Sequence, residues 1–113
     1  MATHLLRAKA TPEQIREMLA EYTVMIKVAV DIRRKVLAGG GIMHADCEAL
    51  LLQDGSEQAD IWGANWYPEG ERIEFEALIN MRSWDGNPSM TLQGDDRRQA
   101  VEAVARQILG SVP

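Results

Sequence analysis

Three polar side chains of the kind that bind metal ions or transfer protons follow a run of three glycines. They are His44, Asp46 and Glu48, and each is two residues from the next. On a β-strand this spacing puts all three side chains on one face. One imidazole and two carboxylates could then bind a divalent cation or act as a general acid and base. The spacing is not diagnostic, and in the simpler interpretation these residues cap the preceding loop and face water.

Three neighbouring features could extend this site, and none of them predicts a bound cofactor. Asp60 would sharpen the metal hypothesis if it lay across a hairpin from the three residues, but strand register cannot be read from sequence alone. Cys47 would point to the opposite face, so a buried structural thiol is a better interpretation than a nucleophile paired with His44. The glycines at 39–41 follow a predicted helix, whereas phosphate-binding glycines precede one.

A second candidate site is the turn-rich loop that follows residue 82. Arg82 and Trp84 belong to the residue types enriched at binding hot spots, and they stand beside the turn formers at 85–88. Trp84 could pack over its own hairpin, which would make it part of the core. If it is exposed instead, it marks a surface for a protein partner or a small ligand.

The composition is that of an ordinary globular domain with an acidic surface. The chain has 113 residues, 46% hydrophobic and 26% charged, with a formal net charge of −5 and a pI near 5.0. A negative domain repels phosphate backbones, and the basic clusters at 33–35 and 97–98 are short, so we expect no nucleic-acid binding. Trp62 and Trp66 lack interleaved Lys or Arg, which favours core packing over base stacking.

The chain shows no sequence signal for export or membrane insertion. Its amino-terminal segment contains no apolar run of about seven residues, and no stretch reaches the roughly 18 apolar residues of a membrane span. The single cysteine cannot form an internal disulfide, which suits a reducing compartment. We therefore expect a cytoplasmic protein that does not bind membranes.

The first predicted element is a long amino-terminal helix over residues 12–37, after a loose segment or short strand at 1–10. Thr11 can cap this helix, Pro12 suits its first turn, and Gln14 completes a capping box. Apolar residues then recur with the 3.6-residue period of an amphipathic helix, and the glycines at 39–41 end it. The periodic residues are Ile15, Met18, Leu19, Tyr22, Met25, Ile26, Ala29, Ile32, Val36 and Leu37.

Short segments separated by turn signals follow and predict four antiparallel strands. The expected strands cover residues 44–53, 59–66, 72–82 and 90–93. A strong hairpin signal at 54–55 separates the first two strands, and a short carboxy-terminal helix over 95–109 follows the last. The predicted fold is a single α+β domain over residues 1–113, an antiparallel four-stranded meander in the order α-β-β-β-β-α.

Both faces of this predicted sheet carry bulky apolar side chains. Leu50, Leu51 and Leu52 are consecutive and would alternate between the faces, and Leu78 interrupts the polar face of its strand. Because two helices usually share one face of such a sheet, we expect the other face to pack against a second copy of the chain. A homo-oligomer is predicted, with a dimer favoured. The expected interface or binding residues are Arg82, Trp84, Trp62, Trp66, Leu50, Leu52 and Leu78.

Several short motifs resemble a family of short bacterial proteins catalogued only as a domain of unknown function. The motifs are AGGG at 38–41, HADCE at 44–48, DGS at 54–56, IWGANW at 61–66, INMR at 79–82 and GNPSM at 86–90. The resemblance covers most of residues 20–110. The family usually places a proline after the arginine, where this chain has Ser83 and Trp84. The resemblance implies a bacterial origin and no established activity.

Three functions are compatible with these observations. The first is a small self-associating binding or interaction protein without catalysis, for a protein partner or a small ligand. The second is a metal-assisted or general acid-base enzyme that uses His44, Asp46 and Glu48 on a small polar substrate. The third is an acidic regulatory partner of a basic protein.

Overall fold

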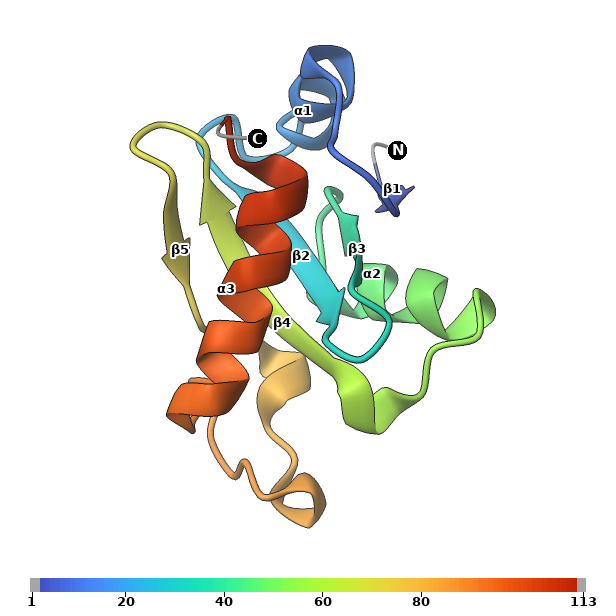
Figure 1. Ribbon diagram of the computed structural model, residues 1–113, viewed down its shortest axis with the longest axis vertical. Coiled ribbons are helices and arrows are strands. Elements are labelled where there is room, and N and C mark those ends of the chain that lie inside the picture. Colours follow the sequence, from blue (N-terminus) through green and yellow to red (C-terminus); the bar gives the residue numbers. More distant parts are fainter. Residues whose placement is uncertain (1–2, 112–113) are drawn as a thin grey trace.

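Five antiparallel strands form one sheet, in the spatial order β1-β3-β2-β4-β5 (Figure 1). The computed structural model describes residues 3–111. The strands are β1 (His4–Leu6), β2 (Ile26–Asp31), β3 (Val36–Gly39), β4 (Ile61–Tyr67) and β5 (Arg72–Glu74). The central strand, β2, pairs with β3 on one side and with β4 on the other. The fold is therefore built around the hairpin of β2 and β3.

The turn of this hairpin is held by one buried carboxylate. The side chain of Asp31 accepts hydrogen bonds from the backbone N–H groups of Arg33 and Arg34, each at 2.9 Å. Lys35 then adopts a left-handed conformation, with φ of 59°, and donates its N–H to the carbonyl oxygen of Asp31. These contacts reverse the chain within four residues, at a point where the sequence analysis expected a continuous helix.

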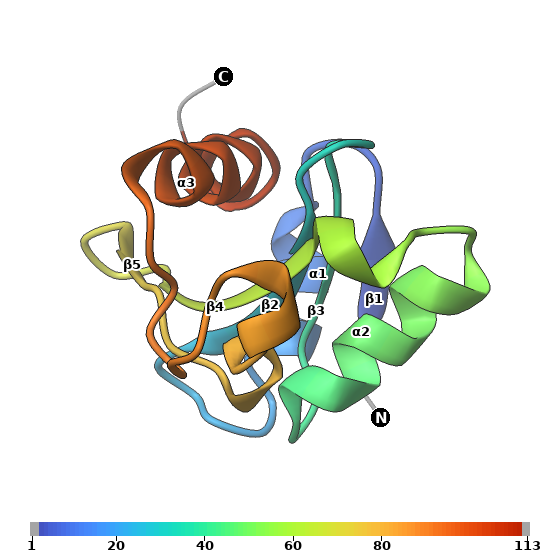
Figure 2. The same cartoon turned by 90° about the horizontal axis from the view of Figure 1, so that it is seen from below.

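The helices lie on both faces of the sheet. The α-helices are α1 (Pro12–Met18), α2 (His44–Gln53) and α3 (Asp95–Leu109), and the short 3₁₀ helices are η1 (Gln58–Asp60), η2 (Leu78–Asn80) and η3 (Ser83–Asp85). Seen along the sheet, α3 covers one face and α2 the other (Figure 2). Within residues 3–111, no helix combines the length and the hydropathy needed to cross a membrane.

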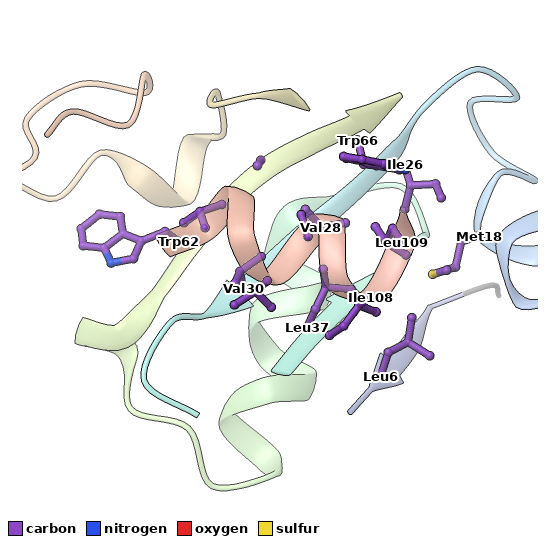
Figure 3. Packing of buried hydrophobic residues seen from close by; sticks show 14 of the residues in the cluster. Leu6, Met18, Ile26, Val28, Val30, Leu37, Trp62, Trp66, Ile108 and Leu109 are labelled. Carbon is purple, nitrogen blue, oxygen red and sulfur yellow. The ribbon is translucent and has the colours of Figure 1, made fainter. Parts of the chain in front are cut away.

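Each face of the sheet has its own hydrophobic core. The larger core lies between the sheet and α3 (Figure 3). Its buried members are Leu6, Met18, Ile26, Val28, Val30, Leu37, Trp62, Ala64, Trp66, Leu92, Val101, Val104, Ala105, Ile108 and Leu109. The smaller core lies under α2 and consists of Ala29, Val36, Ala38, Cys47, Leu51 and Ile61. Alternate residues of β2 point to opposite cores, as the two-residue period of a strand requires.

The predicted long helix over 12–37 is wrong. Its start is confirmed, because Thr11 and Gln14 form the expected capping box, but α1 ends at Met18. The remainder forms β2 and β3, because its β-branched residues also alternate with a period of two and favour a strand. The described part of the 1–10 segment contains the short strand β1; residues 1 and 2 lie outside the described residues.

The four-stranded meander is also wrong. Residues 44–53 form α2, since Ala, Glu and Leu are good helix formers and the buried side chains of His44, Cys47 and Leu51 follow helical spacing. The expected strand over 72–82 is regular only in β5, after which the chain turns through η2. Residue Thr91 makes a single bridge to Glu76 instead of a full strand. The strand β4 and the helix α3 are confirmed close to their predicted bounds.

The premise of the self-association argument does not hold in this fold. The argument required a sheet face that the chain cannot cover, but α2 and α3 cover opposite faces. The three leucines at 50–52 lie on α2, where only Leu51 is fully buried. Trp62 and Trp66 are buried in the larger core beneath α3. An uncovered face of the sheet therefore does not supply an oligomer interface, while Leu52, Leu78 and Trp84 of the predicted set are exposed.

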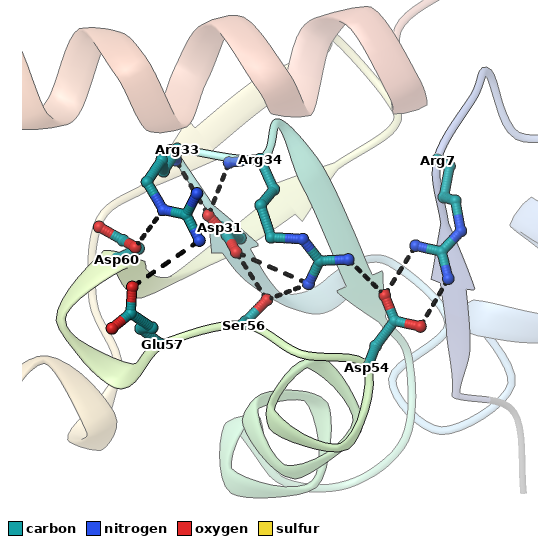
Figure 4. Close-up of polar contacts among 8 residues, drawn as sticks. All are labelled: Arg7, Asp31, Arg33, Arg34, Asp54, Ser56, Glu57 and Asp60. Atoms are coloured by element: carbon teal, nitrogen blue, oxygen red, sulfur yellow. Dashed lines mark hydrogen bonds and ion pairs between the residues drawn. The ribbon is translucent and has the colours of Figure 1, made fainter.

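A network of ion pairs joins the β2–β3 turn to the carboxyl end of α2 (Figure 4). Asp54 accepts two hydrogen bonds from Arg7, at 2.5 and 2.7 Å, and one from Arg34 at 2.6 Å. Ser56 donates to the buried carboxylate of Asp31 at 2.6 Å and accepts from Arg34 at 2.7 Å. The network ties three separate segments of the chain together at the end of the molecule opposite the amino end of α2.

Candidate functional site

A cavity opens between the amino end of α2, the strands β2 and β4, and the segment that follows β5. Its volume is about 460 Å³, within the range of roughly 300–1,000 Å³ that small-molecule sites occupy. The lining residues are Met25, Lys27, Met43, His44, Ala45, Asn65, Glu76, Ala77, Leu78, Ile79 and Met90. Most of them are apolar, and a few polar groups converge among them.

The floor of the cavity is a pair of polar residues on neighbouring strands. Lys27 of β2 lies directly opposite Asn65 of β4. Both point to the α2 side of the sheet, because their neighbours Val28 and Ala64 point into the core under α3. This part of the α2 face lies beyond the end of the helix, so the polar pair is left open to the cavity.

His44, the first residue of α2, closes one side of this floor. Its Nε2 atom lies 3.0 Å from the carbonyl oxygen of Ala64 and 2.9 Å from Oδ1 of Asn65. Both partners are acceptors, so Nε2 carries the hydrogen and Nδ1 carries a lone pair in the neutral ring. No residue within 3–111 makes a hydrogen bond to Nδ1 in this structure. Burial lowers the pKa of His44, and the nearby charge of Lys27 lowers it further, which favours the neutral imidazole.

Lys27 brings a positive charge into this mainly apolar space. Its Nζ lies 4.9 Å from the centre of the Tyr22 ring, and the Tyr22 hydroxyl donates to the carbonyl oxygen of Ile42 at 2.8 Å. In the described part of the chain, no carboxylate lies within 4.0 Å of the ammonium group. The charge of Lys27 is thus only partly compensated, by an aromatic ring.

The walls of the cavity are methionines and branched aliphatic residues, several of which face solvent. Met43 is 54% exposed, Leu78 67% and Met90 42%. Methionine side chains adapt to differently shaped ligands because they are unbranched and polarizable. Large exposed apolar side chains grouped around one opening are unusual in a protein surface that has no binding role.

The wall opposite α2 is held in place by Asn80. Its side chain accepts a hydrogen bond from the N–H of Gly63 at 2.7 Å and donates one to the carbonyl oxygen of Gly63 at 2.9 Å. The Asn80 side chain therefore pairs with the backbone N–H and C=O groups that a neighbouring strand would otherwise pair with at this point of β4. Gly63 permits the contact, because a Cβ atom there would lie 2.5 Å from the Cβ of Ala77. The wall is a fixed part of the fold.

Two further buried polar residues shape the loop beyond this wall. Asn87 donates to the carbonyl oxygens of Asn80 and Ser89, both at 2.8 Å, and accepts from the N–H of Gln93 at 2.7 Å. The guanidinium of Arg82 donates to two carbonyl oxygens of the η1 region at 2.6 Å and stacks on Trp62, 3.8 Å from the ring centre. These contacts fix the backbone conformation of the loop.

A model of a family of proteins of unknown function matches residues 4–108 of the chain. The chain belongs to the DUF5674 family. The match confirms the resemblance seen in the sequence motifs, while the expected bacterial origin stays a prediction. Neither the comparison with curated proteins nor that with solved structures found a significant match.

The DUF5674 chain does not bring His44, Asp46 and Glu48 together as predicted. On a helix, residues two apart point in nearly opposite directions, so Asp46 is exposed on another side of α2 from His44. Glu48 follows His44 by four residues, but its carboxylate accepts from the Gln58 side chain at 3.5 Å, whereas His44 is bonded to β4. Asp60 is bonded to Arg33 at 2.9 Å. Within residues 3–111, no group of three or more His, Cys, Asp or Glu side chains is arranged to hold a metal ion.

Cys47 is a buried structural thiol, as predicted. Its Sγ lies 3.3 Å from the carbonyl oxygen of Gly40. Burial raises the pKa of this thiol to about 12. The nucleophilic thiolate is therefore scarce at neutral pH, which argues against covalent catalysis by Cys47.

Arg82 and Trp84 do not form one exposed pair. Arg82 is buried, whereas Trp84 on η3 is 73% exposed. Of the two alternatives for Trp84, exposure is the observed one. Leu78 is both exposed and part of the cavity wall, while Leu52 is 41% exposed on α2 and Leu50 is half-buried.

The sequence analysis missed Lys27, Asn65, Asn80 and Asn87 as site residues. The sequence analysis placed Lys27 in a helix, so its pairing with Asn65 of β4 was not expected. Asn65 bonds to the His44 side chain and Asn80 to the backbone of Gly63, both distant in sequence, so their roles depend on the tertiary fold. Asn87 bonds to backbone groups within its own loop. The available signal was the presence of two asparagines in one short loop, since buried amides often close irregular loops.

Proposed function

We propose that this protein is a non-catalytic binding protein and that the cavity at the amino end of α2 is its ligand site. The observation that carries the proposal is the combination of an open cavity of about 460 Å³ with apolar walls and a small set of polar groups on its floor. Pockets of this composition are the usual form of small-molecule sites. The proposal refines the first of the functions compatible with the sequence.

The rigidity of the surroundings supports binding. His44 and Asn65 are fixed to each other and to the sheet by hydrogen bonds, and Asn80 fixes the opposite wall to β4. Polar groups that are held before a ligand arrives lose little conformational entropy when it binds. The methionines supply the adaptable part of the surface, so a fixed floor is combined with flexible walls.

Catalysis is left out of the proposal for three physical reasons. The proton-bearing nitrogen of His44 is engaged by two protein acceptors, and Cys47 is buried with a raised pKa. Of the three residues that the sequence suggested as an acid-base set, Asp46 lies on another side of α2 from His44. A neutral imidazole with one free lone pair can still accept a hydrogen bond from a ligand.

A cavity-filling variant tests the proposal. Ala45 is exposed and lines the cavity, so Ala45→Trp should fill it without disturbing a core. Small amphipathic compounds would be titrated into ¹⁵N-labelled protein, and amide shifts recorded. We expect shifts concentrated at cavity residues in the native protein and lost in Ala45→Trp. The matched control is Ala103→Trp on the outer side of α3, which should bind as the native protein does. Equal shifts in both variants would contradict the proposal.

A second candidate function is supported by the exposed apolar residues of the neighbouring loop. Leu78, Met81 and Trp84 are 67%, 46% and 73% exposed and recur every three residues along η2 and η3. This spacing favours a protein-protein contact, including the predicted homodimer. Light scattering at micromolar concentration compares the native protein with Trp84→Ser. If the native protein is a dimer and Trp84→Ser dissociates it, this function is supported. If the native protein is a monomer and binds no partner through Trp84, this function is contradicted.

A further inference from the structure

We infer that the ligand of this cavity is a small carboxylate with an apolar side chain, and that Lys27 binds the carboxylate. The inference rests on the proposed function and deepens it by naming a ligand class. Its basis is the charge pattern of the cavity, where a lysine without an ion-pair partner in the described chain faces apolar walls.

The first argument is the state of the Lys27 ammonium group. It contacts an aromatic ring and lies beyond 4.0 Å from every carboxylate of residues 3–111. By contrast, Arg7, Arg33 and Arg34 all form ion pairs within the protein. A half-buried cation in mainly apolar surroundings gains more from an arriving anion than a fully solvated one does, because the local dielectric constant is lower.

The second argument is that the floor residues themselves carry no negative charge, and the carboxylate of Glu74, 3.5 Å from Nδ2 of Asn65, lies outside the cavity lining. His44 is uncharged in its neutral form, and Asn65 is an amide. The amino end of α2 borders the same space, and no side chain caps it, so its first N–H groups add a partial positive charge. Together, Lys27 and this helix end make the floor complementary to an anion.

The third argument concerns the remaining polar wall residue. Glu76 is exposed and is the one acidic side chain among the described residues that line the cavity. It lies across the cavity from α2, on the segment that continues β5. A ligand that carries an ammonium group beside its carboxylate, as an amino acid does, would place that ammonium toward Glu76. The apolar walls determine which side chain of the ligand fits. A branched aliphatic or thioether group would pack against Met25, Met43 and Ile79.

The test compares matched ligand pairs by calorimetry at low ionic strength. The probes are 4-methylpentanoate and 4-methylpentanamide, and also 3-phenylpropanoate with its amide. We expect each carboxylate to bind at least about tenfold more tightly than its amide, which corresponds to about 1.4 kcal/mol. Lys27→Gln should remove this preference, and Lys27→Arg should retain it. Lys35→Gln, which changes an exposed lysine in the β2–β3 turn, should behave as the native protein.

The outcomes separate this inference from the proposed function. Equal binding of carboxylate and amide, or a preference that survives Lys27→Gln, would overturn the inference while leaving the cavity as a binding site. Failure of both members of every pair to bind would overturn the proposed function and the inference together. Tighter binding of leucine than of 4-methylpentanoate, lost in Glu76→Gln, would support the inference and identify the ligand as an amino acid.

Discussion

His44 lies where the amino end of α2 meets the central strands, and its surroundings determine its protonation. Its Nε2 atom is shared between a backbone carbonyl and the Asn65 side chain, and its ring borders the cavity. Neither acceptor carries a formal charge, so these two hydrogen bonds offset only part of the cost of burying a charged ring, and the pKa of His44 is lowered. The histidine is therefore best suited to act as a neutral hydrogen-bonding group.

The stability of the protein should depend on the protonation of His44. Burial lowers the pKa of this residue below its ordinary value of 6.5. As the pH falls through about 6.5, the unfolded chain takes up a proton at this position before the folded protein does, so the free energy of unfolding decreases. We expect urea denaturation between pH 7.5 and 5.5 to show a smaller decrease for His44→Gln than for the native protein. Identical pH profiles would show that His44 is not responsible.

At the scale of elements, two segments form the opposite walls of the cavity, and each is held by contacts that are distant in sequence. The helix α2 is packed on the sheet through Cys47 and Leu51, and its far end is tied to the β2–β3 turn through Asp54. The opposite wall depends on Asn80, which bonds to both backbone groups of Gly63. The position of the cavity follows from these two attachments.

Removal of the Asn80 side chain should loosen the wall and destabilise the protein. Asn80→Ala leaves the buried N–H and carbonyl groups of Gly63 without partners, and each such group costs about 1–3 kcal/mol. We expect a loss of about 2–4 kcal/mol in the free energy of unfolding, measured by urea denaturation. Asn80→Asp retains an acceptor for the Gly63 N–H but buries a charge without a donor for the carbonyl, so it should not restore stability. A loss below about 0.5 kcal/mol for Asn80→Ala would contradict this role.

The attachment at the other end of α2 should be sensitive to acid. Hydrogen bonds from Arg7 and Arg34 hold the pKa of Asp54 well below its ordinary value of 3.8. A lowered carboxylate pKa stabilises the folded state above the pKa of the unfolded chain, and this contribution is lost as the pH falls. We expect Asp54→Asn to be less stable than the native protein at pH 7. The difference should narrow below about pH 4, as shown by thermal unfolding over this range. A constant difference at all pH values would exclude the charge as its cause.

The elements differ in how well the sequence predicted them, and the reason is physical. The helix α3 was predictable because its apolar spacing and terminal glycine agree, although Gly94 and not Asp95 or Asp96 is its N-cap and no side chain caps it. The apolar residues of 26–36 fit both the helical and the strand period. Their high content of β-branched residues and the turn stabilised by Asp31 favour two strands over one helix. Residues 44–53 carry three consecutive leucines, which suggested a two-sided strand, although helix propensity favoured α2.

The candidate site was less predictable than the fold. His44 was identified, but with partners on its own segment, whereas its partners lie on β4. Lys27 and Asn65 become neighbours only through the register of β2 with β4. Register is fixed by the burial of a whole face and not by the residues that happen to meet on the other face, so such pairs cannot be read from one sequence.

At the scale of the whole molecule, the two helices divide the sheet unequally. The helix α3, with 15 residues, covers the larger core, whereas α2, with 10, leaves the ends of β2 and β4 open on its side. The cavity occupies this uncovered part of the sheet. Of the apolar residues that the sequence assigned to a dimer interface, Trp62 and Trp66 are internal, whereas Leu52, Leu78 and Trp84 are exposed. Leu78 belongs to the cavity wall and Trp84 to the adjoining loop.

The methionine methyl groups provide the most direct test of the cavity as a ligand site. Protein labelled with ¹³C at these methyls reports on Met25, Met43 and Met90 in the cavity, with Met18 in the core and Met81 outside the cavity as internal controls. On titration with 4-methylpentanoate, we expect the three cavity signals to shift together with one dissociation constant while both control signals stay in place. Shifts of Met81 or Met18 equal to those of the cavity methionines, or no shift at all, would contradict the account.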